Sequence, residues 1–171
     1  MSTGKISVIF YKAEGGLFSK LIRFYKRTPY SHCEILFSNG FCGTSSEICQ
    51  GVYYYIPDKK TLSEEYWDFI DIECDAEEET KMKDIFLYEE CGCGYDWLGI
   101  FFCQVFPWGR QHSSKWFCSE ICTYALKRIH HLKPVFENLK PHYIDPGELY
   151  EILSEFSRVN PKIQVRKKNT N

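Results

Sequence analysis

A predicted β-hairpin in the first quarter of the chain is the feature that most limits the fold. Residues 30–37, YSHCEILF, alternate so that His32 and Glu34 share one face, a period typical of a β-strand. Residues 38–41, SNGF, then supply an Asn-Gly pair, which favours a tight turn between antiparallel strands. We therefore expect an antiparallel return strand at about 41–45.

The remaining elements are predicted from similar patterns. Three further segments have the alternation or the β-branched and aromatic content of strands, and these are residues 6–12, 51–56 and 66–73. Apolar residues at helical spacing, acidic first turns and terminal Gly or Pro residues predict five helices, at 17–25, 76–92, 96–105, 119–130 and 147–156. The expected fold class is therefore α+β, with a small, mostly antiparallel sheet packed by helices.

Composition indicates one domain that spans residues 1–171. Hydrophobic residues make up 44% and aromatic residues 17% of the chain, too much for a disordered protein, and no repeat or linker divides it. The formal net charge of −2 gives no reason to expect a nucleic-acid partner. Residues 158–171 are basic, and we expect them to form a short basic C-terminal tail that frays.

The cysteine content bears on the compartment and on metal binding. Nine cysteines accompany an N-terminus without the basic start and apolar run of an export signal, so we expect a reducing compartment: the cytoplasm, or the host cytoplasm if the protein is viral. The longest apolar stretch, residues 97–106, is about half a membrane span, which predicts no transmembrane segment. Cys91 and Cys93 form a C-x-C pair without a second pair at ligand spacing, so no metal or other cofactor is expected.

The segment KWFCSEICTYAL, residues 115–126, places Cys118 just before a predicted helix. If the helix begins at Ser119, unpaired N–H groups and the positive end of the helix dipole would favour the thiolate over the thiol and could bind an oxyanion. A buried thiol packed between Phe117 and Ile121 would fit the same sequence. Local features alone leave both interpretations open.

His32 is the second candidate for chemistry, because a histidine in the middle of an apolar strand is unusual. A nucleophilic cysteine needs a base within hydrogen-bond reach, and that base needs a group that orients its other nitrogen. Glu34 follows two residues later, beside the ring rather than in line with it, so we expect it to tune charge more readily than to orient. A solvent-exposed histidine at a strand edge is the alternative.

The two motifs together resemble a known family. YSHCEILF, then Gly51-Val52, then KWFCSEICTYAL is similar to the circularly permuted branch of the NlpC-type papain-like hydrolases, the YiiX/YaeF-like group with many phage relatives. In that branch the strand histidine precedes the helix cysteine, the reverse of the order in papain. The resemblance covers roughly residues 6–150 and implies a circularly permuted papain-like fold.

The resemblance also implies residue roles. Cys118 would be the nucleophile, His32 the general base, and a third polar residue would assist His32. No Glu stands clearly in the middle of the strand after the histidine, and the options are Ser45, Glu47 at the probable edge of that strand, or Glu34. Glu34 is the first choice and Ser45 the second. The residues expected to line the substrate cleft are Tyr30, Ser45 and Trp116.

The implied function is a cysteine hydrolase of amidase or peptidase type that uses an acyl-thioester on Cys118. We expect a monomer that acts on a peptide, acylated or protein substrate without a cofactor. Two alternatives stay open: a non-catalytic binding or host-interaction protein on the same fold, and a lipid-directed acyltransferase.

Overall fold

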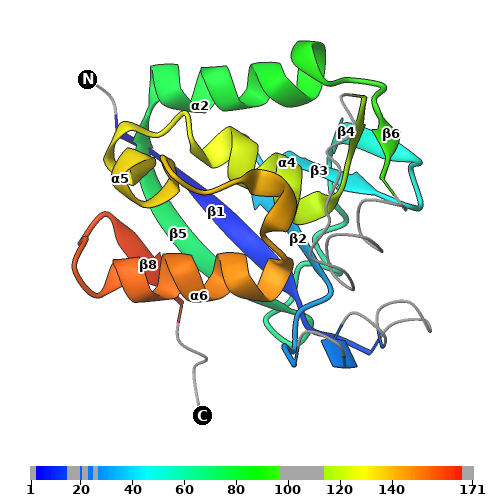
Figure 1. Ribbon diagram of the computed structural model, residues 1–171, viewed down its shortest axis with the longest axis horizontal. Coiled ribbons are helices and arrows are strands. Elements are labelled where there is room, and N and C mark those ends of the chain that lie inside the picture. The colour runs from blue at the N-terminus through cyan, green and yellow to red at the C-terminus, as the bar shows by residue number, and fades with distance from the viewer. Residues whose placement is uncertain (1–2, 15–19, 21–22, 25–26, 97–113, 167–171) are drawn as a thin grey trace.

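The computed structural model describes residues 3–14, 20, 23–24, 27–96 and 114–166 (Figure 1). The predicted helices at 17–25 and 96–105 lie mostly outside these residues. The described chain forms a mixed α+β fold built on one curled eight-stranded sheet, with strand order β7-β6-β4-β3-β2-β1-β5-β8. Every neighbouring pair of these strands is antiparallel except β6 and β7, so the predicted α+β class and mostly antiparallel sheet are confirmed.

The elements have the following bounds. The strands are β1 (Thr3–Tyr11), β2 (His32–Leu36), β3 (Cys42–Ser46), β4 (Gly51–Tyr55), β5 (Trp67–Asp75), β6 (Gly94–Tyr95), β7 (Lys115–Trp116) and β8 (Ile163–Val165). The α-helices are α2 (Ala76–Asp84), α4 (Cys118–Leu126), α5 (Lys133–Phe136) and α6 (Pro146–Ser157). A π-helical turn, Ile85–Glu89, continues α2, and 3-10 turns occupy His130–Leu132 and Pro141–Tyr143.

The predicted hairpin is formed by β2 and β3. Ile35 pairs with Gly43 and Leu36 with Cys42, and Gly40 adopts a φ of 84° in the turn. A positive φ is the conformation that glycine adopts without steric cost, which explains why an Asn-Gly sequence turns here.

Beyond these two register pairs, β2 and β3 separate. His32, Cys33 and Glu34 form no register pair with Thr44, Ser45 and Ser46. The Thr44 hydroxyl donates instead to the Cys33 carbonyl over 2.9 Å. The sheet is therefore split at the beginning of β2, and a side chain on one face can meet groups from the other face at this point.

The two faces of the sheet are covered differently. Alternate residues of β1, such as Val8 and Phe10, join the main core beneath α4 and α6, which lie together on one face in Figure 1. Ile9 from the same strand lies on the opposite face in a second, smaller cluster with Trp67 and Phe69. The face opposite the helices is thus partly free of regular structure among the described residues.

Helix α4 begins one residue earlier than predicted. Phe117 is its N-cap residue, so Cys118 occupies the first helical turn rather than the position before it. The N-cap side chain makes no capping hydrogen bond. The helix ends at Leu126 rather than at residue 130, since a 3-10 turn follows.

The predicted frayed tail contains an ordered strand, and this part of the prediction was wrong. Within residues 158–171, β8 pairs antiparallel with the edge of β5. The buried Asp71 carboxylate receives hydrogen bonds from Ser7 over 2.6 Å and from Arg166 over 2.8 Å. These bonds outweigh the effect of burial and lower the pKa of Asp71. The ion pair between Arg166 and Asp71 joins the tail to a strand that is distant in sequence. The local sequence of the tail therefore does not predict it.

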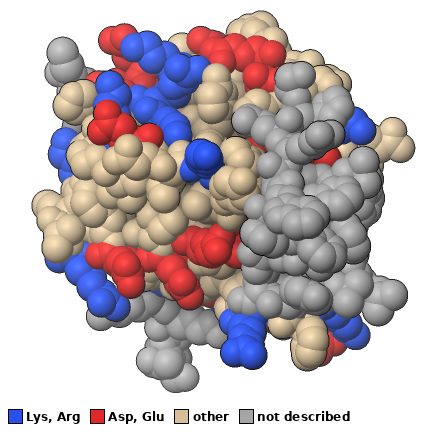
Figure 2. Space-filling view, viewed as in Figure 1, with Lys and Arg blue, Asp and Glu red and all other residues tan. Residues whose placement is uncertain are grey.

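Charges of both signs occur on the helix-covered face, with acidic side chains gathered over α6 (Figure 2). Among the residues coloured there, no broad basic surface of the kind that binds nucleic acid is present. No helix in the described ranges is long and apolar enough to cross a membrane.

Candidate active site

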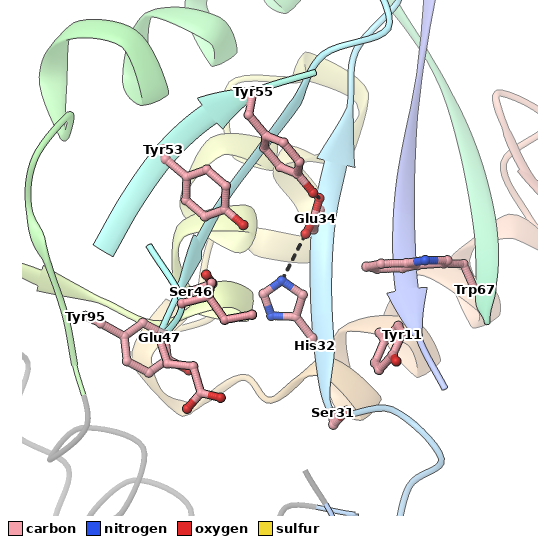
Figure 3. Close-up of a pocket in the computed structure, with 11 residues that line it drawn as sticks. Tyr11, Ser31, His32, Glu34, Ser46, Glu47, Tyr53, Tyr55, Trp67 and Tyr95 are labelled. Carbon is pink, nitrogen blue, oxygen red and sulfur yellow. Dashed lines mark hydrogen bonds and ion pairs between the residues drawn. The ribbon is translucent and has the colours of Figure 1, made fainter. Parts of the chain in front are cut away.

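A cavity of about 310 Å³ opens beside His32 on the face of the sheet opposite the helices (Figure 3). We call it the His32 cavity. Its described lining comes from the split between β2 and β3 and from the neighbouring strands: Tyr11, Ser31, His32, Glu34, Ser46, Glu47, Ile48, Tyr53, Tyr55, Trp67 and Tyr95.

The His32 ring is held by the Glu34 carboxylate, which in turn accepts a hydrogen bond from a tyrosine. His32 Nε2 lies 3.1 Å from Glu34 Oε1, and the Tyr55 hydroxyl donates to Glu34 Oε2 over 2.8 Å. The Glu34 side chain is 4% exposed, whereas that of His32 is 22% exposed. The carboxylate is therefore the buried support and the imidazole the accessible group. Glu34 can orient the ring as well as tune its charge, which is more than the i, i+2 spacing predicted.

The Cys118 thiol and the His32 ring interact, each shifting the pKa of the other, although the two residues lie far apart in the sequence. A hydrogen bond from the Cys33 side chain, together with the charge of His32 and a hydrogen bond to it, outweighs burial and holds the pKa of Cys118 well below its usual range. Burial by itself lowers the pKa of His32, but interactions with Cys118 and then Glu34 raise it well above the usual value. Thiolate and imidazolium stabilise each other, which is the charge state that a nucleophilic cysteine requires.

Two further thiols lie on the helix side of this pair. Cys33 is buried, and burial followed by its interactions with Cys118 and Cys122 raises its pKa well above the usual range, so it is a neutral S–H donor. The Cys122 thiol donates to the Cys33 carbonyl over 3.7 Å. Cys122 is fully buried one turn after Cys118 and contributes packing, as its sequence position suggested.

The structure does not bring the three predicted cleft residues into the His32 cavity. Tyr30 is buried in the main core, where its hydroxyl donates to Asp68 over 2.7 Å. Ser45 is fully buried, and its hydroxyl donates to the Trp116 carbonyl over 2.8 Å. The Trp116 indole N–H donates to Glu90 over 2.7 Å. These side chains therefore support the strands around the site, and Ser45 is not the group that contacts His32.

The cavity is lined instead by residues that the motif comparison missed. Tyr53 and Tyr55 alternate along β4 and point to the same face as His32, with Trp67 and Tyr95 on other sides of the ring (Figure 3). The run of tyrosines in GVYYYI was a usable signal, since strand alternation places its first and third tyrosines together.

Replacing the Glu34 carboxylate by an uncharged amide of the same shape should separate the role of Glu34 from that of Ser45. In Glu34→Gln the pKa of His32 should fall, because the hydrogen bond and the negative charge that Glu34 contributes both favour imidazolium. An NMR titration of the His32 ring protons measures this. Ser45→Ala is the matched control and should leave the pKa in place; a fall only in Ser45→Ala would contradict the assignment.

Among the described residues, no group of three or more His, Cys, Asp or Glu side chains is arranged to hold a metal ion. Neither a scan against protein-family models nor a search of curated proteins found a match to this chain.

Proposed function

We propose that this chain is a cysteine hydrolase of amidase or peptidase type on a circularly permuted papain-like domain. The observation that carries the proposal is the meeting of Cys118, in the first turn of α4, with His32, at the beginning of β2, while Glu34 holds the other side of the ring. The order of these elements, strand histidine before helix cysteine, supports the permuted arrangement.

The first half of the reaction uses the Cys118 thiolate and the His32 imidazolium. Because Nε2 bonds to Glu34, Nδ1 is the His32 nitrogen left to face the thiolate. The Cys118 sulfur attacks the carbonyl carbon of the substrate, a C–S bond forms, and the carbonyl oxygen becomes an oxyanion near the N-terminal N–H groups of α4. His32 then gives its proton to the leaving amine, the C–N bond breaks, and an acyl-thioester remains on Cys118.

The second half returns the enzyme to its starting state. Neutral His32 takes a proton from a water molecule, whose oxygen attacks the thioester carbonyl. The C–S bond breaks, the carboxylic acid product leaves, and the pair is again thiolate and imidazolium. Glu34 keeps the ring in place through both halves and stabilises the imidazolium each time it forms.

An activated ester tests this chemistry without knowledge of the natural substrate. With p-nitrophenyl acetate, intact-protein mass spectrometry and peptide mapping should show one acetyl group on Cys118. The rate of acylation should fall by roughly tenfold or more in His32→Ala, because the imidazolium that stabilises the Cys118 thiolate is missing. Cys118→Ala should show no acyl-enzyme, whereas the control Cys49→Ala should behave as the wild type. Acetylation spread evenly over the cysteines, or unchanged in Cys118→Ala, would favour a non-catalytic binding protein.

A further inference from the structure

The segment Cys91-Gly92-Cys93 forms a tight turn that the proposed reaction does not use. This turn follows the π-helical turn and leads into β6 (Figure 1). Its closing hydrogen bond runs from the Cys93 N–H to the Glu90 carbonyl over 3.0 Å, and Gly92, at the third position of the turn, has a φ of 82°. A positive φ at this position favours glycine. The two cysteines therefore stand on either side of the glycine that makes the turn.

Such a turn brings two cysteines within the range of a disulfide bond. Consecutive Cα atoms are about 3.8 Å apart, so a bent three-residue segment places its ends within the roughly 4.4–6.8 Å that disulfides span. Both cysteines are free thiols in this structure, and Cys91 is exposed whereas Cys93 is partly buried. A small disulfide in solution therefore reaches Cys91 first, and Cys93 is the second thiol behind it.

The Glu90 carboxylate holds this second thiol. The Cys93 S–H donates to Glu90 Oε2 over 3.3 Å, and the Trp116 indole N–H donates to the same oxygen over 2.7 Å. The carboxylate is thus fixed beside Cys93 by a second donor, in a position to accept the thiol proton. Burial, then Glu90 and then the charge of Cys91 raise the pKa of Cys93, which agrees with the closeness of the two thiols.

We propose that Cys91 and Cys93 are a redox-active dithiol that exchanges with low-molecular-weight disulfides such as oxidised glutathione. Cys91 loses its proton to solvent, its thiolate attacks one glutathione sulfur, and a mixed disulfide forms as the first glutathione thiolate leaves. Cys93 then passes its proton to Glu90 and attacks the Cys91 sulfur. The mixed disulfide breaks, and the second glutathione thiolate leaves and takes up that proton. The cysteine pair is oxidised by two electrons, and the glutathione disulfide is reduced by the same two.

The exposure of the pair indicates that the exchange is reversible. An exposed disulfide that closes so short a segment is readily reduced again by thiols, unlike a buried structural one. The pair should therefore follow the ratio of reduced to oxidised glutathione in its surroundings. This inference goes beyond the proposed function, since neither Cys118 nor His32 takes part in the exchange.

The exchange can be measured on the full chain with oxidised glutathione as the probe. After incubation, acid quenching and alkylation of the remaining thiols, peptide mapping by mass spectrometry should find Cys91 and Cys93 joined, with the peptide lighter by two hydrogen atoms. Exposed Cys49 should instead carry glutathione. An excess of reduced glutathione should restore both thiols of the pair. The Cys118→Ala variant should give the same result, which separates this test from that of the proposed function.

Two serine variants assign the effect to the pair. Cys93→Ser keeps a hydrogen-bond donor for Glu90 but removes the second sulfur, so glutathione should remain on Cys91 at a level about tenfold or more above that in the wild type. Cys49→Ser is the matched control and should leave the exchange at Cys91 and Cys93 unchanged. Stable glutathione on Cys91 in the wild type would overturn the proposal. A disulfide that joins Cys91 or Cys93 to any other cysteine would overturn it as well.

Discussion

Iodoacetamide at pH 6 should alkylate Cys118 before any of the other eight cysteines of the chain. An ordinary thiol is mostly protonated at this pH, and only the thiolate is a good nucleophile. Interactions with Cys33 and His32 keep the pKa of Cys118 low, and the His32 ring beside it is partly exposed. Exposure alone would predict that Cys118 is alkylated after the exposed cysteines, since Cys118 is only 4% exposed.

The same labelling should depend on His32. In His32→Ala the imidazolium that stabilises the thiolate is missing, and each unit by which the pKa of Cys118 rises above the working pH removes about a factor of ten in thiolate. Alkylation of Cys118 at pH 6 should therefore slow by about tenfold or more. Cys49 and Cys91, which are exposed, are internal controls whose labelling should not change. Faster labelling of these two than of Cys118 in the wild type would contradict the charge state proposed for the site.

Replacing Glu120 by glutamine should stabilise the protein at alkaline pH. Glu120 is 1% exposed, one carboxylate oxygen has no hydrogen-bond partner, and burial raises its pKa from 4.5 to about 8. The opposing hydrogen bond from the Phe117 N–H is outweighed by this burial and by the charges of Asp96 and Glu90. The folded chain thus keeps Glu120 protonated where the unfolded chain has already lost the proton.

The sign of the pH dependence follows from this difference. Below pH 4.5 the carboxyl is neutral in both states, so Glu120→Gln should change little. As the pH rises through 4.5 toward 8, the wild type loses stability, up to about 5 kcal/mol, and the glutamine variant does not. Thermal or urea unfolding at pH 5 and pH 9 measures the difference, with exposed Glu137→Gln as the control. An equal shift at both pH values would show that Glu120 is not held neutral by the fold.

The strands were predictable because each carries its own local pattern. The alternation in YSHCEILF and the Asn-Gly turn were enough to place β2 against β3, and the β-branched runs were enough for β1 and β5. The strands β6, β7 and β8 were missed since they are two or three residues long, too short for a periodic signal. Their positions depend on the edges of other strands, since β6 pairs with β4, β7 with β6 and β8 with β5.

The candidate site was predictable only in part. Cys118, His32 and Glu34 stand in short motifs, and the structure brings all three together. The residues Tyr30 and Trp116 flank those motifs in sequence, but Tyr30 precedes β2 and Trp116 ends β7 before α4, and both side chains are buried in the main core. The split between β2 and β3, which lets the histidine of one face meet the cysteine of the other, is a tertiary feature without a local signature.

The charge state of Cys118 is the central claim, and a direct titration tests it. The ultraviolet absorbance of thiolate, taken as the difference between wild type and Cys118→Ser, should persist well below the pH at which free cysteine is protonated. In the His32→Ala background the same difference should appear only at higher pH. A wild-type difference that rises as in free cysteine, with no effect of His32→Ala, would contradict the account.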